Sequence, residues 1–425
     1  MTQRDVAGIT RPCSVGSAST PLGRSFPASV LLQLCCNQLV PRMTRTKCCK
    51  IQAFILIGVL CIMFLIWFEP GLPNQVTTSH TGSSNPVQLL NKATVGPERS
   101  PAVYSRSLYF WDDCHRNLSA ANVTGFSTLP GHLQNFLYYR HCKQFPLLLD
   151  LPHKCGGADG SADVFLLLVV KSSPENYERR QVLRETWAAE REHRGARIRR
   201  VFISGTKGVD FEKRQMNRLL ALEHKKHGDI LQWDFEDSFF NLTLKQVLFL
   251  QWMEGRCPQA RFLLNGDDDI FAHTDNMVEF LQGHDGGRHL FVGHLIQNVG
   301  PIRERGSKYF VPVQVQESES YPPYCGGGGF LLSGHTAMVI HNASKSITLH
   351  PIDDVYMGMC LARAGLRPIS HMGVRTAGLH IPSSRVGRHD PCYYKDVLLV
   401  HRFLPHQIYI MWDQVHDPAL RCRMK

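Results

Sequence analysis

The chain has 425 residues, of which 43% are hydrophobic, and its formal net charge is +11. This length and apolar content allow one large domain or two ordinary domains with a packed core. Much of the positive charge lies near the N-terminus, because residues 1–50 carry seven Lys or Arg against one Asp. The rest of the chain is only weakly basic, which excludes a strong electrostatic case for nucleic acid as a partner.

An uncharged apolar run of 18 residues, Ile51–Phe68, follows the basic segment. This is near the minimum length of a membrane-spanning helix. Because the positive flank of such a helix stays in the cytosol, we expect a type II signal anchor, with residues 1–50 as a cytosolic tail and the C-terminal part in the lumen. A cleaved signal peptide is the alternative, but no small-residue cleavage site follows the run. Met43 is a second plausible start, and the sequence does not decide between it and Met1.

Residues 69–107 are rich in Pro, Gly, Ser, Thr and Asn, which predicts a flexible stem before a lumenal globular domain at 108–425. Eight cysteines lie beyond the anchor: Cys114, Cys142, Cys155, Cys257, Cys325, Cys360, Cys392 and Cys422. In an oxidising compartment they predict up to four disulfides, whose pairing stays open. N-glycosylation sequons at Asn117, Asn122, Asn241 and Asn342 fit the secretory pathway.

Apolar segments alternate with amphipathic ones after residue 160, which predicts a parallel sheet of the α/β class. The expected strands are Asp163–Lys171, Arg197–Ser204, Asp229–Phe235 and Arg261–Leu264. The expected helices between them are Arg179–Ala189, Phe211–His227 and Leu242–Glu254. The second half is less regular, with strands expected at Leu290–Gly293 and Val397–His401 and helices at Asp353–Ala364 and Gln407–Val415. Ligands of such sheets bind beyond the carboxyl ends of the strands.

Three consecutive acids, Asp267, Asp268 and Asp269, follow the fourth expected strand. Their carboxylates repel one another unless a cation or hydrogen-bond donors compensate. Oxygen ligands of this kind suit Mn²⁺ or Mg²⁺, with a phosphate group supplying further oxygens. For the motif taken alone, a solvated acidic turn is the alternative.

A run of four glycines, Gly326–Gly329, lacks the residues that would make it a P-loop or a dinucleotide-binding fingerprint. It is either a flexible hairpin or a place where the backbone must approach a flat ligand such as a sugar ring. Asp353 and Asp354 precede an expected helix. Either acid could cap that helix, or one could cap it while the other acts as a general base, with its pKa raised by the neighbouring charge.

Several nitrogen-bearing residues lie in the same motifs. His401 ends an apolar strand and could supply a nitrogen ligand to Mn²⁺, although most histidines are packed or surface residues. Lys171 ends the first expected strand, and Arg179, Arg180 and Arg184 follow on one helical segment. These four could contact a diphosphate, or the arginines could be solvated helix charges.

Six motifs occur in one order along the chain: VKSSPENYERRQVLRETW (170–187), DFEDSFFNLTLK (234–245), LNGDDDIF (264–271), YPPYCGGGGFLLS (321–333), PIDDVYMGMCL (351–361) and LLVHRF (398–403). Together they resemble the inverting β-1,3-glycosyltransferases of the Golgi. The stretch 298–309 and the PIDDV motif resemble the β-1,3-N-acetylglucosaminyltransferase branch, and the chain is most similar to the core 1-extending type. Branches that transfer galactose tend to carry Glu-Asp-Val where this chain has Asp353-Asp354-Val355.

The resemblance implies a GT-A-type fold, a divalent metal, Mn²⁺ or Mg²⁺, and a UDP-sugar donor. It places Asp267 and Asp269 in the metal-binding DxD motif, with His401 as a further metal ligand. It makes Asp354 the general base. The positions that it places in donor-site motifs are Lys171, Arg180, Arg184, Asp237, Lys245, Asp267, Asp268, Gly327 and Gly328.

The function implied by the resemblance is transfer of N-acetylglucosamine from UDP-GlcNAc to the 3-hydroxyl of a terminal galactose on glycoprotein or glycolipid glycans. The expected location is the Golgi membrane, with the catalytic domain in the lumen. Transfer of galactose from UDP-galactose and a non-catalytic glycan-binding module are the alternatives. The sequence leaves the acceptor open among core 1, poly-N-acetyllactosamine and keratan-type chains.

Overall fold

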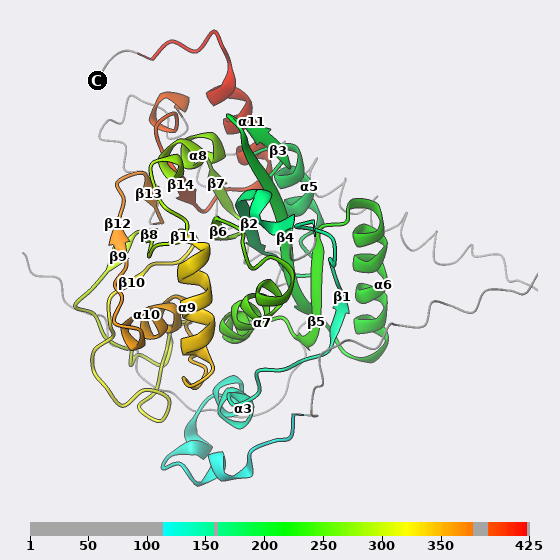
Figure 1. Cartoon of the computed structure of the whole chain (residues 1–425). Helices are drawn as coiled ribbons and strands as arrows, with labels where there is room; N and C mark the ends of the chain where they lie inside the picture. The colour runs from blue at the N-terminus through cyan, green and yellow to red at the C-terminus, as the bar shows by residue number, and fades with distance from the viewer. Residues whose placement is uncertain (1–113, 157–159, 377–389, 423–425) are drawn as a thin grey trace, which may run out of the picture. The chain divides into compact units, whose positions relative to one another are not determined.

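The computed structural model describes residues 114–156, 160–376 and 390–422, which all belong to one compact unit (Figure 1). The predicted cytosolic tail, signal anchor and stem, and the start of the predicted lumenal domain at residue 108, lie outside the described residues. Within the described ranges, no helix is both long enough and apolar enough to cross a bilayer.

A nine-stranded sheet forms the centre of the unit, in the order β1-β5-β4-β2-β6-β11-β8-β12, with β3 paired to β4. Its strands are β1 (Leu147–Leu149), β2 (Val164–Lys171), β3 (Arg191–His193), β4 (Ala196–Thr206), β5 (Ile230–Glu236), β6 (Phe262–Asp267), β8 (Phe291–Gly293), β11 (Gly329–Ser333) and β12 (Ile369–Ser370). β2 pairs in parallel with β4 and β6, and β4 with β5. The four expected strands are therefore confirmed as a parallel group, and the antiparallel strands β1, β3 and β11 that pair with this group make the sheet mixed.

Two smaller sheets complete the β-structure, one of β10 paired with β9 and one in the order β13-β14-β7. Their strands are β7 (Ile270–Ala272), β9 (Leu295–Ile296), β10 (Tyr324–Cys325), β13 (Val374–Arg375) and β14 (Leu399–His401). β14 pairs antiparallel with β7, directly after the acidic triplet. The expected strands Leu290–Gly293 and Val397–His401 are thus confirmed, in shortened form, as β8 and β14.

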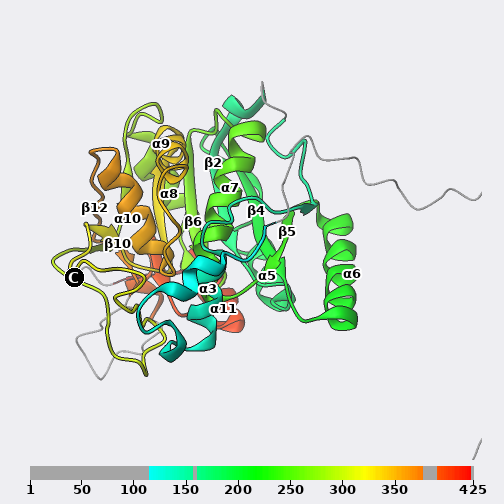
Figure 2. The same ribbon diagram turned by 90° about the horizontal axis from the view of Figure 1, so that it is seen from below.

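Helices cover both faces of the sheet (Figures 1 and 2). They are α3 (Gly131–Tyr139), α5 (Tyr177–Glu185), α6 (Asp210–His227), α7 (Leu242–Arg256), α8 (Thr274–Gln282), α9 (Gly334–Ser344), α10 (Asp353–Arg363) and α11 (Pro405–His416), with short 3-10 turns η1 (Leu118–Asn122), η2 (Phe126–Thr128), η3 (Ser161–Asp163), η4 (Phe239–Asn241) and η5 (Pro391–Tyr393). In Figure 1, α7 and α9 lie below the central strands β2 and β6, and α5 and α11 lie above them.

The central strand β2 shows why this arrangement forms. All eight of its residues are buried, and alternate side chains enter two different cores. Leu166 and Leu168 pack with α5, α8 and α11, whereas Leu167 and Val169 pack with α7, α9 and α10. A continuous apolar strand buried on both faces is what a parallel sheet requires.

The helix after β2 is shorter than the expected Arg179–Ala189, because it ends at Glu185. Trp187 leaves the helix and is completely buried, and its indole N–H donates to the carbonyl of Ile270 at 2.9 Å. This bond satisfies the polar atom of a large buried ring. It also ties the end of α5 to β7, beside the acidic triplet.

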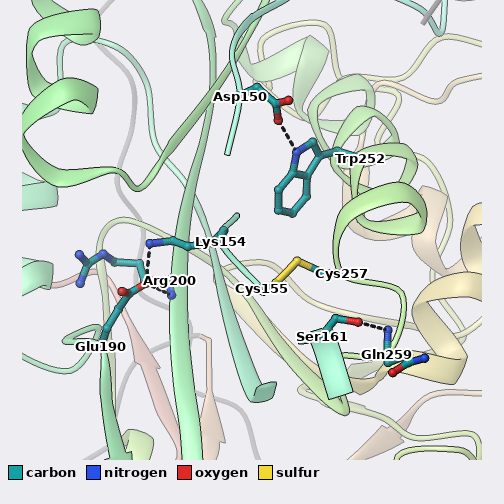
Figure 3. The surroundings of a disulfide bond; sticks show 9 residues. All are labelled: Asp150, Lys154, Cys155, Ser161, Glu190, Arg200, Trp252, Cys257 and Gln259. Atoms are coloured by element: carbon teal, nitrogen blue, oxygen red, sulfur yellow. Dashed lines mark hydrogen bonds and ion pairs between the residues drawn. A yellow bond between two sulfur atoms is a disulfide. The ribbon is translucent and has the colours of Figure 1, made fainter. Parts of the chain in front are cut away.

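The disulfides found are Cys114–Cys142, Cys155–Cys257 and Cys392–Cys422. The sequence allowed four, but Cys325 and Cys360 are both buried free thiols. The Cys155–Cys257 bond joins the segment before β2 to the end of α7 (Figure 3). Beside it, the indole N–H of Trp252 donates to Asp150 at 2.9 Å. The segment that leads into the sheet is therefore held covalently and by a hydrogen bond.

A buried ion-pair network joins α5, α6 and the segments around β4 and β5. Arg180 donates to both carboxylate oxygens of Glu223, at 2.8 and 2.7 Å, and is 1% exposed. Arg184 contacts Glu223 at 2.7 Å and Asp229 at 2.8 Å. Arg200 also contacts Asp229, at 2.7 Å. Burial tends to raise the pKa of Asp229, but the two arginines outweigh it and lower that pKa.

Arg180 and Arg184 therefore do not face an open site, as the predicted diphosphate contacts would require. A buried guanidinium needs a counter-charge and hydrogen-bond acceptors, and the fold supplies them internally. Arg180 also donates to the backbone carbonyls of Ser173 and Pro174, at 2.7 and 3.0 Å. Its role is to fix the loop that follows β2.

Replacement of Asp229 by asparagine removes the shared counter-charge of Arg184 and Arg200. We expect the free energy of unfolding, measured by urea denaturation at neutral pH, to fall by about 3–5 kcal/mol. This is the usual cost of leaving a buried charge unpaired. The matched control is Glu279→Gln, because Glu279 pairs with Arg194 at the exposed surface at 2.9 Å. That control is expected to cost less than about 1 kcal/mol, and equal losses in both variants would contradict the analysis.

Candidate active site

The candidate active site lies where the carboxyl ends of β2 and β6 meet the end of β14 and the start of α10. Strand register places Lys171, the last residue of β2, opposite Asp267, the last residue of β6. His401, the last residue of β14, pairs with Ile270 directly after the acidic triplet. Backbone pairing alone therefore brings distant motifs to one edge of the sheet, where α/β proteins bind ligands.

Asp267, Asp269 and His401 offer three ligand atoms that all lie within 4.8 Å of one another. Nε2 of His401 lies 3.0 Å from Oδ1 of Asp269 and 3.7 Å from Oδ2 of Asp267. Burial tends to raise the pKa of Asp269, but the hydrogen bond and the charge of His401 outweigh it and lower that pKa. Two carboxylates and one imidazole suit a divalent cation such as Mn²⁺. The residues thus fit the predicted metal.

Asp268, the middle acid, points away from this group. It is buried, and its Oδ2 accepts hydrogen bonds from the Ser172 hydroxyl at 2.7 Å and from the Asn176 amide at 2.8 Å. Burial raises the pKa of Asp268. Asp268, which the sequence placed among donor-binding residues, therefore ties the loop after β2 to the end of β6.

Lys171 lies between two carboxylates. Its Nζ is 2.9 Å from Oδ1 of Asp267 and 2.8 Å from Oδ2 of Asp353. Burial tends to lower the pKa of Lys171, but the charges of Asp267 and Asp353 outweigh it and raise the pKa. Gln246 on α7 donates to the same oxygen of Asp353 at 3.0 Å. The N-cap of α10 is Ile352, with no side-chain cap bond, so the expectation that Asp353 or Asp354 caps this helix is wrong.

Asp354 is the carboxylate with a free oxygen. Among the described residues, its Oδ1 has no hydrogen-bond partner although the atom is buried. Burial and the charge of Asp353 raise the pKa of Asp354 well above its ordinary value, and Lys171 opposes this only in part. A carboxylate with a raised pKa and an unused oxygen can accept a proton from an incoming hydroxyl.

Asp354 lines a cavity of about 350 Å³. His401 also lines it, together with aliphatic residues, glycines and a set of aromatic or polar residues: His294, Tyr309, Tyr321, Tyr324, Thr376 and Arg402. The hydroxyl of Tyr321 is buried and has no hydrogen-bond partner in the described part of the chain. A small pocket with rings and a few convergent polar groups is typical of a site for an organic ligand.

The glycine run connects β10 to β11 beside this cavity. A Cβ on Gly327 would lie 2.8 Å from Oδ2 of Asp354. Gly328 has φ +98°, and a Cβ there would lie 2.7 Å from Cγ of His401. Glycine is therefore required because the backbone approaches the side chains of the site itself. The sequence predicted that the backbone of these glycines lies close to another group, but that group was expected to be the ligand.

Asp237 and Lys245, also predicted in donor-site motifs, form a buried pair at 2.8 Å. Oδ2 of Asp237 also accepts a hydrogen bond from the backbone N–H of Gly205 at 2.8 Å. The pair thus holds together the ends of β4 and β5 and the start of α7, and it positions this edge of the sheet.

Sequence reasoning missed three residues that support the site. Gln246 orients Asp353, whereas Ser172 and Asn176 orient Asp268. Ser172 and Asn176 lie within the first quoted motif, where a signal was available. Gln246 follows the second motif, and only the packing of α7 against α10 brings it to the site.

Comparison with known proteins agrees with this geometry. The family described as Galactosyltransferase matches residues 178–372. N-acetyllactosaminide beta-1,3-N-acetylglucosaminyltransferase 3 of Homo sapiens is 60% identical over 310 residues, which are 73% of this chain and 82% of the relative. Acetylgalactosaminyl-O-glycosyl-glycoprotein beta-1,3-N-acetylglucosaminyltransferase of Homo sapiens is 47% identical over 382 residues, which are 89% of this chain and 97% of that relative.

Similarity to solved structures is weak. The crystal structure of the galactosyltransferase LgtC with donor and acceptor sugar analogs is 13% identical, and the match covers 59% of this chain and 96% of that one. Its TM-score of 0.28 is too low to support an argument.

The sequence matches and the site define a glycosyltransferase of the Galactosyltransferase family. Within it, the chain belongs to the β-1,3-N-acetylglucosaminyltransferases, because relatives with that name share 60% and 47% identity over most of their length. The predicted family is confirmed.

Replacement of Gly328 by alanine places a methyl group against the His401 ring and strains a backbone with φ +98°. We expect the affinity for Mn²⁺, measured by isothermal titration calorimetry, to fall about 10- to 100-fold, as for loss of a group that orients a ligand. The control is Gly131→Ala at the start of α3, where an added Cβ has no neighbour within 4 Å. Unchanged Mn²⁺ affinity in Gly328→Ala would contradict a metal site that depends on the position of His401.

Proposed function

We propose that this protein transfers N-acetylglucosamine from UDP-GlcNAc to the 3-hydroxyl of a terminal galactose on glycoprotein or glycolipid glycans. The observation that carries the proposal is Asp354, a carboxylate with a raised pKa and an unpaired oxygen that lines a cavity beside the acidic triplet. Such a group is suited to activate an acceptor hydroxyl. The names of the relatives, which specify β-1,3 transfer of N-acetylglucosamine, support this donor and linkage over transfer of galactose.

The proposal includes a GT-A-type fold with a divalent cation, Mn²⁺ or Mg²⁺, at the donor site. Asp267, Asp269 and His401 would hold it. When bound, the cation supplies positive charge that stabilises the diphosphate of the departing UDP. Lys171 adds a fixed positive charge at the same edge of the sheet, between Asp267 and Asp353.

Asp354 is the proposed general base. Its Oδ1 accepts the proton of the acceptor 3-hydroxyl. The oxygen of that hydroxyl forms a bond to the anomeric carbon of the donor as the bond between this carbon and UDP breaks. Because attack and departure occur on opposite faces, an α-linked donor gives a β-linked product. Asp353 holds Lys171 and leaves Asp354 without a direct counter-ion, so the base keeps its raised pKa.

We also propose where in the cell the protein lies. Ile51–Phe68 would anchor the chain in the Golgi membrane as a single-pass type II protein, with residues 69–107 as the stem. The three disulfides support the expected location in an oxidising compartment. The non-catalytic alternative is disfavoured because the acidic triplet, PIDDV and the strand ending in His401 are all intact.

The donor is tested by incubating the full-length enzyme and Mn²⁺ with UDP-GlcNAc or UDP-galactose and a galactose-terminated disaccharide. We expect at least about tenfold faster transfer from UDP-GlcNAc, the discrimination that one or two well-placed contacts provide. The same disaccharide with a 3-deoxygalactose end is the control and should give no product. Faster transfer from UDP-galactose would overturn the proposed donor.

Asp354→Asn keeps the size of the side chain but removes the base. We expect kcat to fall about 10²- to 10⁴-fold, the usual contribution of a general base, while Mn²⁺-dependent binding of UDP persists in calorimetry. Asp413→Asn, an exposed acid on α11, is the matched control and should leave kcat unchanged. Activity close to that of the unmodified enzyme in Asp354→Asn would rule out this residue as the base.

A further inference from the structure

A second cavity, of about 570 Å³, lies between α3 and the connection from β5 to α7. Seven rings line it, which are those of His132, Phe136, Tyr139, Phe145, Phe235, Phe239 and Phe240. They come from three separate segments of the chain, and His132 stacks on Phe240 with ring centroids 4.4 Å apart. The donor and base residues described above are absent from its lining.

Polar groups interrupt this aromatic lining. Arg140, Glu236 and Ser238 line the cavity, and within the described ranges their side chains make no hydrogen bond or ion pair. Burial lowers the pKa of the Arg140 guanidinium. Rings that offer flat faces, beside donors and acceptors that are still unused, match the surface of a sugar, which has apolar C–H faces and hydroxyl edges.

The two cavities are neighbours. The ring of Phe239, in the second cavity, meets the ring of Tyr309, in the Asp354 cavity, with centroids 5.6 Å apart. Nζ of Lys308 lies 5.6 Å from the Phe239 centroid and 4.7 Å from that of Tyr309. The linings of the two cavities therefore meet at a pair of aromatic rings with a cation beside them.

We propose that the second cavity is an acceptor subsite, which binds the inner sugar units of a glycan whose terminal galactose lies at Asp354. This inference rests on the proposed function. A cavity of about 350 Å³ at Asp354 holds only the end of a long acceptor. The remaining sugars then extend beyond this cavity, and the Phe239–Tyr309 contact places the second cavity directly beside it.

Two alternative occupants of the second cavity have to be distinguished from an acceptor glycan. Asn241 lines the cavity and belongs to a glycosylation sequon, so its own glycan could fill the space. The segment Leu108–Trp111 carries three aromatic residues just before Cys114, which also lines the cavity. Either occupant would be part of the enzyme and would make the cavity indifferent to acceptor length.

The test compares KM for two acceptors that end in galactose, the N-acetyllactosamine disaccharide and the tetrasaccharide of two such repeats, with the full-length enzyme. Tyr139→Ala removes a ring that lines the cavity and is 38% exposed, so its loss should leave folding intact. We expect KM for the tetrasaccharide to rise about three- to tenfold, the value of one stacking contact. KM for the disaccharide and kcat for both should not change, and Tyr139→Phe should restore the lower KM.

Tyr409→Ala on α11, where the ring is 51% exposed, is the matched control and should change neither KM. Equal KM values for the two acceptors in the unmodified enzyme, or equal effects of Tyr139→Ala on both, would overturn the subsite and leave the proposed function standing. Asn241→Gln should keep the preference for the tetrasaccharide. A preference for the tetrasaccharide that appears only in Asn241→Gln would show that the enzyme's own glycan fills the cavity, and it would overturn the subsite.

A chain that transfers to neither acceptor would instead contradict the proposed function. The subsite is then judged by binding alone, with saturation-transfer NMR of the tetrasaccharide on the unmodified enzyme and on Tyr139→Ala. Signals from the inner sugars that weaken in the variant would support it, and their absence in both proteins would overturn it.

Discussion

The buried cation of Lys171 is the interaction on which the site depends. Asp267, Asp353 and Asp354 come from β6 and α10, and their charges would repel one another at this edge of the sheet. Lys171 contacts the first two directly, at 2.9 and 2.8 Å. Its charge allows Asp267, a proposed metal ligand, and Asp354, the proposed base, to lie close together. It also leaves Asp354 as the one of the three without a direct counter-ion, which keeps its pKa raised.

Buried pairs of the same kind build the scaffold behind the site. Arg184 with Asp229 joins α5 to the start of β5, and Lys245 with Asp237 joins α7 to the end of that strand. Charged residues in these motifs are therefore used to hold strand ends in place. Their removal would leave the partner charge buried and unpaired, which costs more than the pair itself contributes.

The glycines set how closely the parts of the site approach. Gly327 and Gly328 let the β10–β11 connection lie against Asp354 and His401, and both of these residues line the same cavity. The Phe239–Tyr309 contact places the second cavity beside it. The length of acceptor that the enzyme selects would then depend on packing between α3 and the β5–α7 connection, far in sequence from the chemistry.

The sequence by itself determined the strand and helix pattern, the family and most of the residues at the site, because apolar runs and short motifs are local properties. Asp267, Asp269, His401 and Asp354 lie where their motifs predicted. Only the tertiary structure decided the use of the other charges. Arg180 and Arg184 look like ligands of a diphosphate until Glu223 and Asp229, some 40 residues away, are packed against them. Local patterns cannot reveal a partner that only folding brings near, and burial then decides which charges are satisfied internally and which, like Asp354, stay open to a substrate.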